Sequence, residues 1–149
     1  MTDNTVFIPS GRPPARSSFI PPLLLIPLLG YNFFVFLFMG GDPAGWSNGL
    51  LTIPMVSGEL WSLTAGDLML VVGLLCLFFE VLKATNSNRS SVVEHMLSTL
   101  VFVVFLVEFL LIGGAASSVF FLLLIMSLVD VIAGFTVSIT SAHRDVSMN

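Results

Sequence analysis

The stretch that decides the fold runs from residue 119 to residue 139 and reads VFFLLLIMSLVDVIAGFTVSI, with Asp130 as its one charged residue. A helix of about 20 apolar residues is long enough to cross the ~30 Å hydrocarbon core of a bilayer. At a rise of about 1.5 Å per residue, Asp130 then lies roughly 16 Å from either edge. A carboxyl group costs at least ~2.5 kcal/mol at that depth, so we expect it to face protein rather than lipid.

Small and polar residues on this segment predict the face that packs against other helices. They recur at spacings of three and four, which places them on one side of a helix: Ser127, Asp130, Gly134, Ser138 and Ser141. No Lys, Arg or His is expected near the membrane centre, so Asp130 is predicted to lack a charged partner in its own chain. Either it is protonated and bonded to Ser127 or a neighbouring carbonyl, or another chain satisfies it.

The composition identifies the class of protein. Of 149 residues, 56% are hydrophobic and 9% are charged, whereas a soluble domain carries about a quarter of charged residues. The mean hydropathy is +1.02. We therefore predict an all-α integral membrane protein without a second domain. No clustered basic face suggests a nucleic-acid partner, and the single cysteine, Cys76, allows no intrachain disulfide.

The apolar runs predict four transmembrane helices within a membrane domain, flanked by polar tails. The helices cover about 19–39, 64–83, 92–112 and 118–140; the domain covers 19–141, and the tails cover 1–18 and 142–149. Pro21 and Pro22 suit a helix's first turn, whereas Pro27 should bend the helix. A signal peptide is the rival interpretation of the first run, but its length and the lack of an A-x-A-like site favour a retained helix.

The connection from Gly40 to Leu63 is long and still apolar. Residues 50–56 and 59–63 flank Ser57-Gly58, which is consistent with a short β-hairpin closed by a two-residue turn. Pro54 would confine that strand to an edge. A re-entrant or surface-lying loop fits the composition equally well. Trp46 and Trp61 suit the membrane–water interface, where amphipathic rings prefer to lie.

Several short patterns predict where the helices begin and how they pack. Thr64 and Asp67 fit an N-terminal cap, Ser91 and Glu94 fit a capping box, and Ser117 or Ser118 should cap the fourth helix after a tight turn. The second helix carries a stripe of small and polar residues, namely Gly66, Met69, Gly73, Cys76, Glu80 and Lys83.

The basic residues predict the orientation. All five lie in the two tails or in the second loop: Arg12, Arg16, Lys83, Arg89 and Arg144. These segments share one side of the membrane if the chain crosses it four times. The positive-inside rule then places both termini in the cytoplasm and the 40–63 loop outside.

The intramembrane acids are the candidate functional residues. Glu80 is three residues from Lys83 and should pair with it or reach toward the cytoplasmic surface. Glu108 lies about one turn inside the opposite boundary, where Tyr31 or Asn32 could hydrogen-bond it. With Asp130, these acids could form a proton or cation path. However, they stand on different helices at separate levels, and the chain has no internal repeat of the kind common in transporters.

His95 is the candidate for ligating a haem or a chlorophyll-type pigment, although a bis-histidine haem would need a second histidine and only His143 remains. Glu80, Glu94 and His95 have no standard metal-ligand spacing. No G-x-S-x-G, H-E-x-x-H or phosphate-loop pattern occurs. We therefore do not expect an enzyme.

Three stretches resemble those of small, uncharacterised four-span bacterial inner-membrane proteins. They are WSLTAGD at 61–67, FEVLKAT at 79–85 and VDVIAGF at 129–135, and the resemblance covers most of 31–145. It implies a bacterial inner-membrane setting. It carries over no functional residue, because its motifs are not signatures of any activity.

Three functions follow as expectations. The leading one is a non-enzymatic accessory or scaffold subunit of a larger inner-membrane complex, respiratory or photosynthetic, with Trp46 and Trp61 contacting other membrane subunits. The second is a proton- or cation-coupled transporter or channel, working as a homo-oligomer through Glu80, Glu108 and Asp130. The third is a haem- or pigment-binding anchor through His95.

Overall fold

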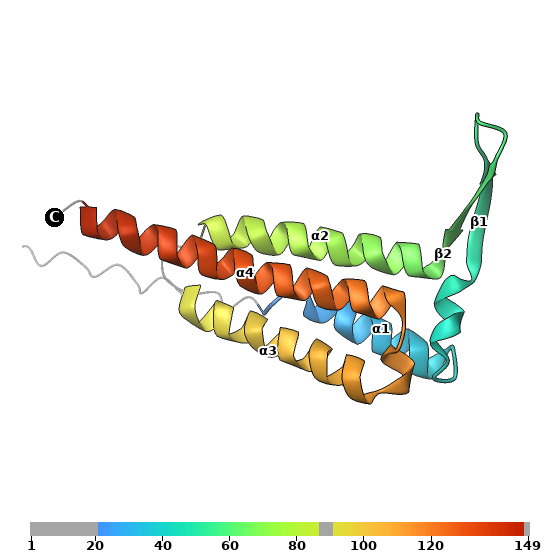
Figure 1. The fold of residues 1–149 in the computed structure, drawn as a ribbon, viewed down its shortest axis with the longest axis horizontal. Coiled ribbons are helices and arrows are strands. Elements are labelled where there is room, and N and C mark those ends of the chain that lie inside the picture. Colours follow the sequence, from blue (N-terminus) through green and yellow to red (C-terminus); the bar gives the residue numbers. More distant parts are fainter. Residues whose placement is uncertain (1–20, 87–90, 148–149) are drawn as a thin grey trace, which may run out of the picture.

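The structure is a computed structural model that describes residues 21–86 and 91–147. Its main helices are α1 (Leu25–Leu37), α2 (Ala65–Asn86), α3 (Ser91–Leu111) and α4 (Ser118–Ser147). Two short 3₁₀ helices, η1 (Pro43–Ser47) and η2 (Gly113–Ala115), and a hairpin of β1 (Gly49–Pro54) and β2 (Leu60–Thr64) complete the fold. The three long helices lie side by side, and α4 packs against both α2 and α3 (Figure 1). The shorter α1 fills only the half of the bundle nearest the hairpin.

Three helical segments are long and apolar enough to cross a membrane: Ala65–Thr85, Val93–Leu111 and Ser118–Val137. They correspond to the last three predicted helices, so the chain is a membrane-embedded helical protein. The described helix α1 has 13 residues, about 20 Å of helix, which is shorter than the hydrocarbon core. Helix α4 continues to Ser147, beyond the end predicted at residue 140.

The prolines at the start of α1 do not act as the sequence suggested. Pro21 and Pro22 precede the helix instead of forming its first turn, and the Pro22 carbonyl accepts the Leu25 N–H at 3.2 Å. Pro27 is the third residue of α1, a position where a backbone N–H has no intrahelical partner to lose. The predicted bend at Pro27 therefore has no cause.

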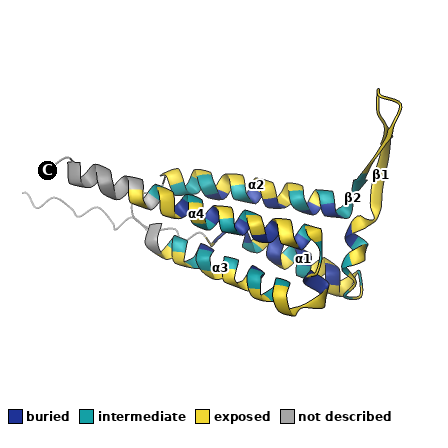
Figure 2. Cartoon of the chain, viewed as in Figure 1, coloured by how far each residue is buried: buried dark blue, intermediate teal, exposed yellow. Residues whose placement is uncertain are grey.

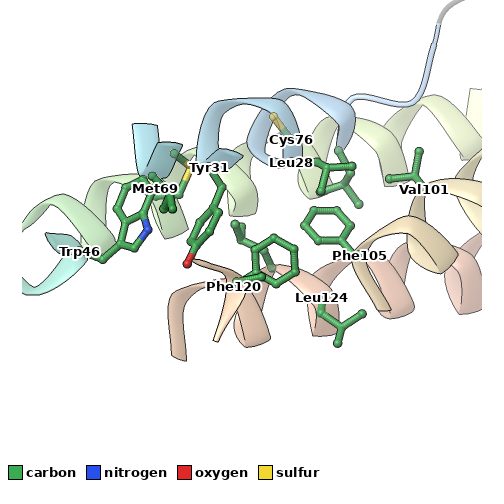
Figure 3. Packing of buried hydrophobic residues seen from close by; sticks show 13 residues of the cluster. Leu28, Tyr31, Trp46, Met69, Cys76, Val101, Phe105, Phe120 and Leu124 are labelled. Atoms are coloured by element: carbon green, nitrogen blue, oxygen red, sulfur yellow. The ribbon is translucent and has the colours of Figure 1, made fainter. Parts of the chain in front are cut away.

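Tyr31 lies at the centre of the core and joins α1 to the turn between α3 and α4 (Figure 3). Its ring is fully buried, stacks on Trp46 at 4.8 Å and meets Phe120 edge-on at 4.8 Å. Its hydroxyl donates to the Gly114 carbonyl at 2.9 Å and lies 2.7 Å from Ser117 Oγ. This buried hydrogen bonding ties α1 to the same end of the bundle as the hairpin.

The predicted stripe of α2 faces α4, as a close helix pair requires. A Cβ at Gly66 would come within 2.7 Å of a Val119 methyl carbon, and one at Gly73 would overlap the Leu123 side chain. Small residues allow two membrane helices to approach closely where hydrophobic attraction between them is absent. In the stripe predicted for α4, Ser127, Asp130 and Gly134 are buried, and the side chains of Ser138 and Ser141 lie outside the described residues.

The predicted cap of α2 is confirmed. Asp67 Oδ2 accepts from the Thr64 backbone N–H at 2.8 Å and from its hydroxyl at 2.7 Å, and Thr64 Oγ1 accepts the Asp67 N–H at 3.1 Å. Ser117, rather than Ser118, caps α4 by accepting the Phe120 N–H at 3.1 Å. The side chain of Ser91, the N-terminal tail 1–18 and the loop 87–90 lie outside the described residues.

The predicted hairpin is confirmed, with a different turn. Strands β1 and β2 pair antiparallel, placing Ile53 opposite Trp61. The Met55 N–H donates to the Glu59 carbonyl at 2.8 Å, so the loop holds three residues, 56–58, instead of two. Gly58 takes φ +90°, which a side chain would disfavour. The hairpin projects from the end of the bundle past α2, nearly perpendicular to the long helices (Figure 1).

Candidate functional site

Charged side chains from α2 and α3 meet at the end of the bundle opposite the hairpin. Lys83 Nζ lies 2.6 Å from Glu80 Oε1 and 4.0 Å from Glu94 Oε2. The side chains are largely buried, with exposed fractions of 4% for Glu80, 17% for Lys83 and 12% for Glu94. The predicted Glu80–Lys83 pair is thus confirmed, and Glu94 joins it in addition to opening α3.

Asp130 of α4 belongs to the same group, which corrects the prediction that it lacks partners in its own chain. It is 5% exposed, it is hydrogen-bonded by Ser98, and its carboxyl group lies within electrostatic reach of Glu80 and Lys83. The predicted bond from Ser127 does not form, because that hydroxyl donates to the Leu124 carbonyl at 2.8 Å. Sequence reasoning missed this meeting because it gives no relative register for α2, α3 and α4.

Together these residues form what we call the ionic cluster, around a cavity of about 10 Å³. Its lining consists of Glu80, Lys83, Ala84, Glu94, His95, Ser98, Asp130 and Gly134. A cavity of this size holds about one water molecule. The backbone also contributes, since the Leu23 N–H donates to Glu80 Oε2 at 2.8 Å. The segment that precedes α1 is therefore attached to the cluster.

His95 of α3 lies beside this cavity, and residues of α4 cover its ring. Its ring stacks on Phe135 with centroids 6.2 Å apart, and a Cβ at Gly134 would overlap the imidazole. Among the described residues, the buried His95 Nε2 atom has no hydrogen-bond partner. The cavity that adjoins this ring is only water-sized. In the described residues, no three His, Cys, Asp or Glu side chains are grouped to hold a metal ion.

Glu108 lies far from this cluster, at the hairpin end of the bundle. Its Oε2 accepts from Asn32 Nδ2 at 2.7 Å, and the Asn32 amide also donates to the Leu28 carbonyl at 3.0 Å. The predicted Asn32 partner is confirmed, whereas the Tyr31 hydroxyl bonds elsewhere. Both residues of this pair are half-buried.

An apolar layer separates the two polar regions. Phe105, which lies between Glu94 and Glu108 along α3, is fully buried, as are Phe120, which packs against it, and Leu123. Glu94 and Glu108 are separated by 14 positions of α3, which is about 21 Å of helix. Glu80 and Asp130 line the same cavity, so they lie at the same depth along the bundle, contrary to the prediction of separate levels. Glu108 lies at a different depth, as predicted.

The hairpin is the second unusual region, because most of its length is exposed (Figure 2) and its residues include many large apolar ones. Every residue of β1 is exposed. Alternation along the strands places four apolar residues on one face, namely Leu51, Ile53, Trp61 and Leu63. On the opposite face, the Thr52 and Ser62 hydroxyls lie 3.1 Å apart. Near the turn, Val56 is fully exposed and Leu60 is 71% exposed.

The two predicted contact tryptophans have opposite environments. Trp61 is 47% exposed on the hairpin, whereas Trp46 is 4% exposed and packs on Tyr31. Trp46 is therefore wrong as a partner-contact residue. Its indole belongs to η1, which folds back onto α1 and α2 and removes the ring from the surface.

These features define a small helical protein embedded in a membrane, with a buried ionic cluster at one end and an apolar hairpin at the other. Comparison with protein-family models, curated proteins and solved structures found no match.

Proposed function

We propose that the chain is a non-enzymatic accessory subunit of a larger complex in a bacterial inner membrane, and that it holds its partner with the β1–β2 hairpin. The observation that carries this proposal is the exposure of apolar side chains along the whole hairpin, outside the helical bundle. An isolated two-stranded hairpin is at best marginally stable in water. A hairpin with this surface gains stability when another molecule covers it.

The proposal includes a four-span arrangement with both termini in the cytoplasm. In it, the apolar run 19–39, which contains α1, makes the first span, and the hairpin lies on the outer side. The positions of the five basic residues support this orientation. Because the hairpin is nearly perpendicular to the long helices, it then runs along the membrane surface. Six residues of β1 reach about 20 Å sideways, over the flank of a neighbouring subunit.

A protein partner suits this hairpin better than lipid. Near the turn, Met55, Val56 and Leu60 are all exposed, on a segment whose two faces cannot both lie on one membrane surface. The outer edges of both strands also present backbone N–H and C=O groups, which hydrocarbon cannot satisfy but a partner strand can. Glu59 is the single charged residue from 49 to 64. The hairpin therefore has no basic residue to attract anionic lipid.

Photocrosslinking in the intact membrane tests the position of the partner. A benzophenone amino acid is placed at Leu60, and at Leu100 of α3, which is 57% exposed, as a control. We expect a discrete protein adduct from position 60 and lipid adducts from position 100. Lipid adducts alone at position 60 would show that the hairpin rests on the bilayer, and would refute the proposal.

Native mass spectrometry of the gently extracted, tagged chain tests the complex itself. We expect a stoichiometric larger partner that is lost in Leu60→Asp and retained in Leu60→Met, because the second change keeps an apolar side chain on the hairpin. A complex that survives Leu60→Asp would show that the hairpin does not hold the partner. A single chain or homo-oligomer alone in the unmodified protein would contradict the accessory function.

Transport by one copy of the chain receives less support from the geometry. A proton or cation path would have to join the ionic cluster to Glu108 through the fully buried layer of Phe105, Phe120 and Leu123. Pigment or haem binding through His95 is opposed by the packing of Phe135 and Gly134 against its ring. The accessory function needs neither a path nor a pocket through the bundle.

A further inference from the structure

The ionic cluster contains more acidic than basic groups. Its carboxyl groups belong to Glu80, Glu94 and Asp130, and its ammonium group belongs to Lys83. With all of these groups charged and His95 neutral, the cluster carries a net charge of −2 within a largely buried volume. An unbalanced charge is costly where water is scarce, so proteins neutralise such groups by pairing or by proton binding.

The available partners are unevenly distributed. Lys83 lies against the two glutamates, and the Leu23 N–H also donates to Glu80. The Asp130 carboxyl group accepts a hydrogen bond from the neutral Ser98 hydroxyl and lies near both Glu80 and Lys83. On the same cavity, the buried Nε2 of His95 has no hydrogen-bond partner in the part of the chain that the structure describes. The cluster thus combines excess negative charge with an unused nitrogen that can bind a proton.

From this arrangement we infer that the ionic cluster is a proton-binding site, which holds at least one exchangeable proton at neutral pH. The proton comes from hydronium in the water at this end of the bundle and leaves a water molecule behind. Its binding reduces the negative charge shared by α2, α3 and α4. Because the groups interact closely, the proton belongs to the set and not to one assigned residue.

Two features make this site exchange with water on one side only. The partly exposed side chains of Lys83 and Glu94 connect it to the nearby surface, where α2 ends and α3 begins. On the other side, the buried Phe105, Phe120 and Leu123 close the interior of the bundle. The water-sized cavity can place one water molecule among the cluster groups. The site therefore binds protons from one end and does not conduct them across.

Infrared spectroscopy of the full chain in lipid nanodiscs tests the carboxyl groups. We expect the C=O stretching band of a protonated carboxyl at pH 7, its loss at high pH, and a changed band in Asp130→Asn. Glu108→Gln, which alters an acid outside the cluster, should leave this band in place. If Asp130→Asn does not fold, ¹³C-labelled aspartate and, separately, ¹³C-labelled glutamate assign the band in the unmodified protein.

Nitrogen NMR tests the imidazole in the same preparation. His143→Gln leaves His95 as the one histidine, so an imidazolium signal at pH 7 would also support the site. The inference is overturned if the protein shows neither a protonated carboxyl nor an imidazolium at pH 7. It is also overturned if the protonated carboxyl is lost in Glu108→Gln and no imidazolium is present.

Discussion

The two ends of the bundle place opposite kinds of side chain in opposite environments. At the ionic cluster, charged groups of three helices are turned inward and are largely buried. At the hairpin, large apolar groups are turned outward and are exposed, from 39% for Ile53 to full exposure for Val56. A carboxylate inside and a leucine outside are each costly for a protein alone in water. Pairing of Glu80 with Lys83 offsets part of that cost at the cluster, whereas at the hairpin the proposed partner would cover the apolar groups.

Among changes to the ionic cluster, the largest effect should come from removing the ammonium group of Lys83. Lys83→Met removes the ammonium group that pairs with Glu80, and breaking a buried ion pair in this way costs about 3–5 kcal/mol. Lys83 keeps some contact with solvent, so we expect about 3 kcal/mol of lost unfolding free energy. Titration of the purified protein with sodium dodecyl sulfate, followed by circular dichroism, would measure it.

The double variant Glu80→Gln/Lys83→Met is the control for this prediction. It removes one charge of each sign, so it should recover most of the stability that Lys83→Met loses. A loss below about 1 kcal/mol in Lys83→Met, the value of an exposed pair, would mean that water reaches the cluster freely. The contrast between the two ends of the molecule would then disappear.

The next largest expected loss of stability comes from disturbing the close packing around Gly134, at the cluster end of the bundle. The Cβ of Gly134→Ala would overlap the His95 imidazole, so the ring or the helix must move. Overpacking of this kind typically costs about 1–3 kcal/mol. Gly30→Ala in α1 is the matched control, because its Cβ would meet the Met69 methyl at an ordinary 3.6 Å. Equal stability of the two variants in the same detergent titration would contradict close packing at Gly134.

The sequence predicted local structure better than it predicted the contacts between helices. The approximate limits of α2 and α3, the Thr64–Asp67 cap and the Glu80–Lys83 pair follow from local spacing, and each is present. In contrast, α1 is shorter and α4 is longer than predicted. The partners of Asp130 depend instead on how far α2 and α3 are shifted along α4, which no local pattern records. The membrane burial of an aspartate indicated that partners exist. Only the packed bundle identifies them as Ser98, Glu80 and Lys83.

The two tryptophans show the same limit of prediction from local sequence. Trp46 and Trp61 lie in one loop and both suit a membrane interface by residue type. Asp42 accepts the Ala44 N–H at 2.9 Å and starts the η1 turn, which folds Trp46 onto Tyr31. The hairpin register keeps Trp61 opposite Ile53 on an exposed face. The sequence therefore gave equal expectations for two residues that the fold separates.

This pair provides the smallest expected effect and a strong internal control. Trp61→Ala should change the stability of the isolated chain by no more than about 0.5 kcal/mol, as at most surface positions. Trp46→Ala should cost about 3–5 kcal/mol, because it leaves a cavity beside Tyr31. In the native complex, Trp61→Ala should weaken partner binding without unfolding the chain. A large loss of stability in isolated Trp61→Ala would mean that the hairpin supports the bundle itself, and its apolar face would no longer need a partner to explain it.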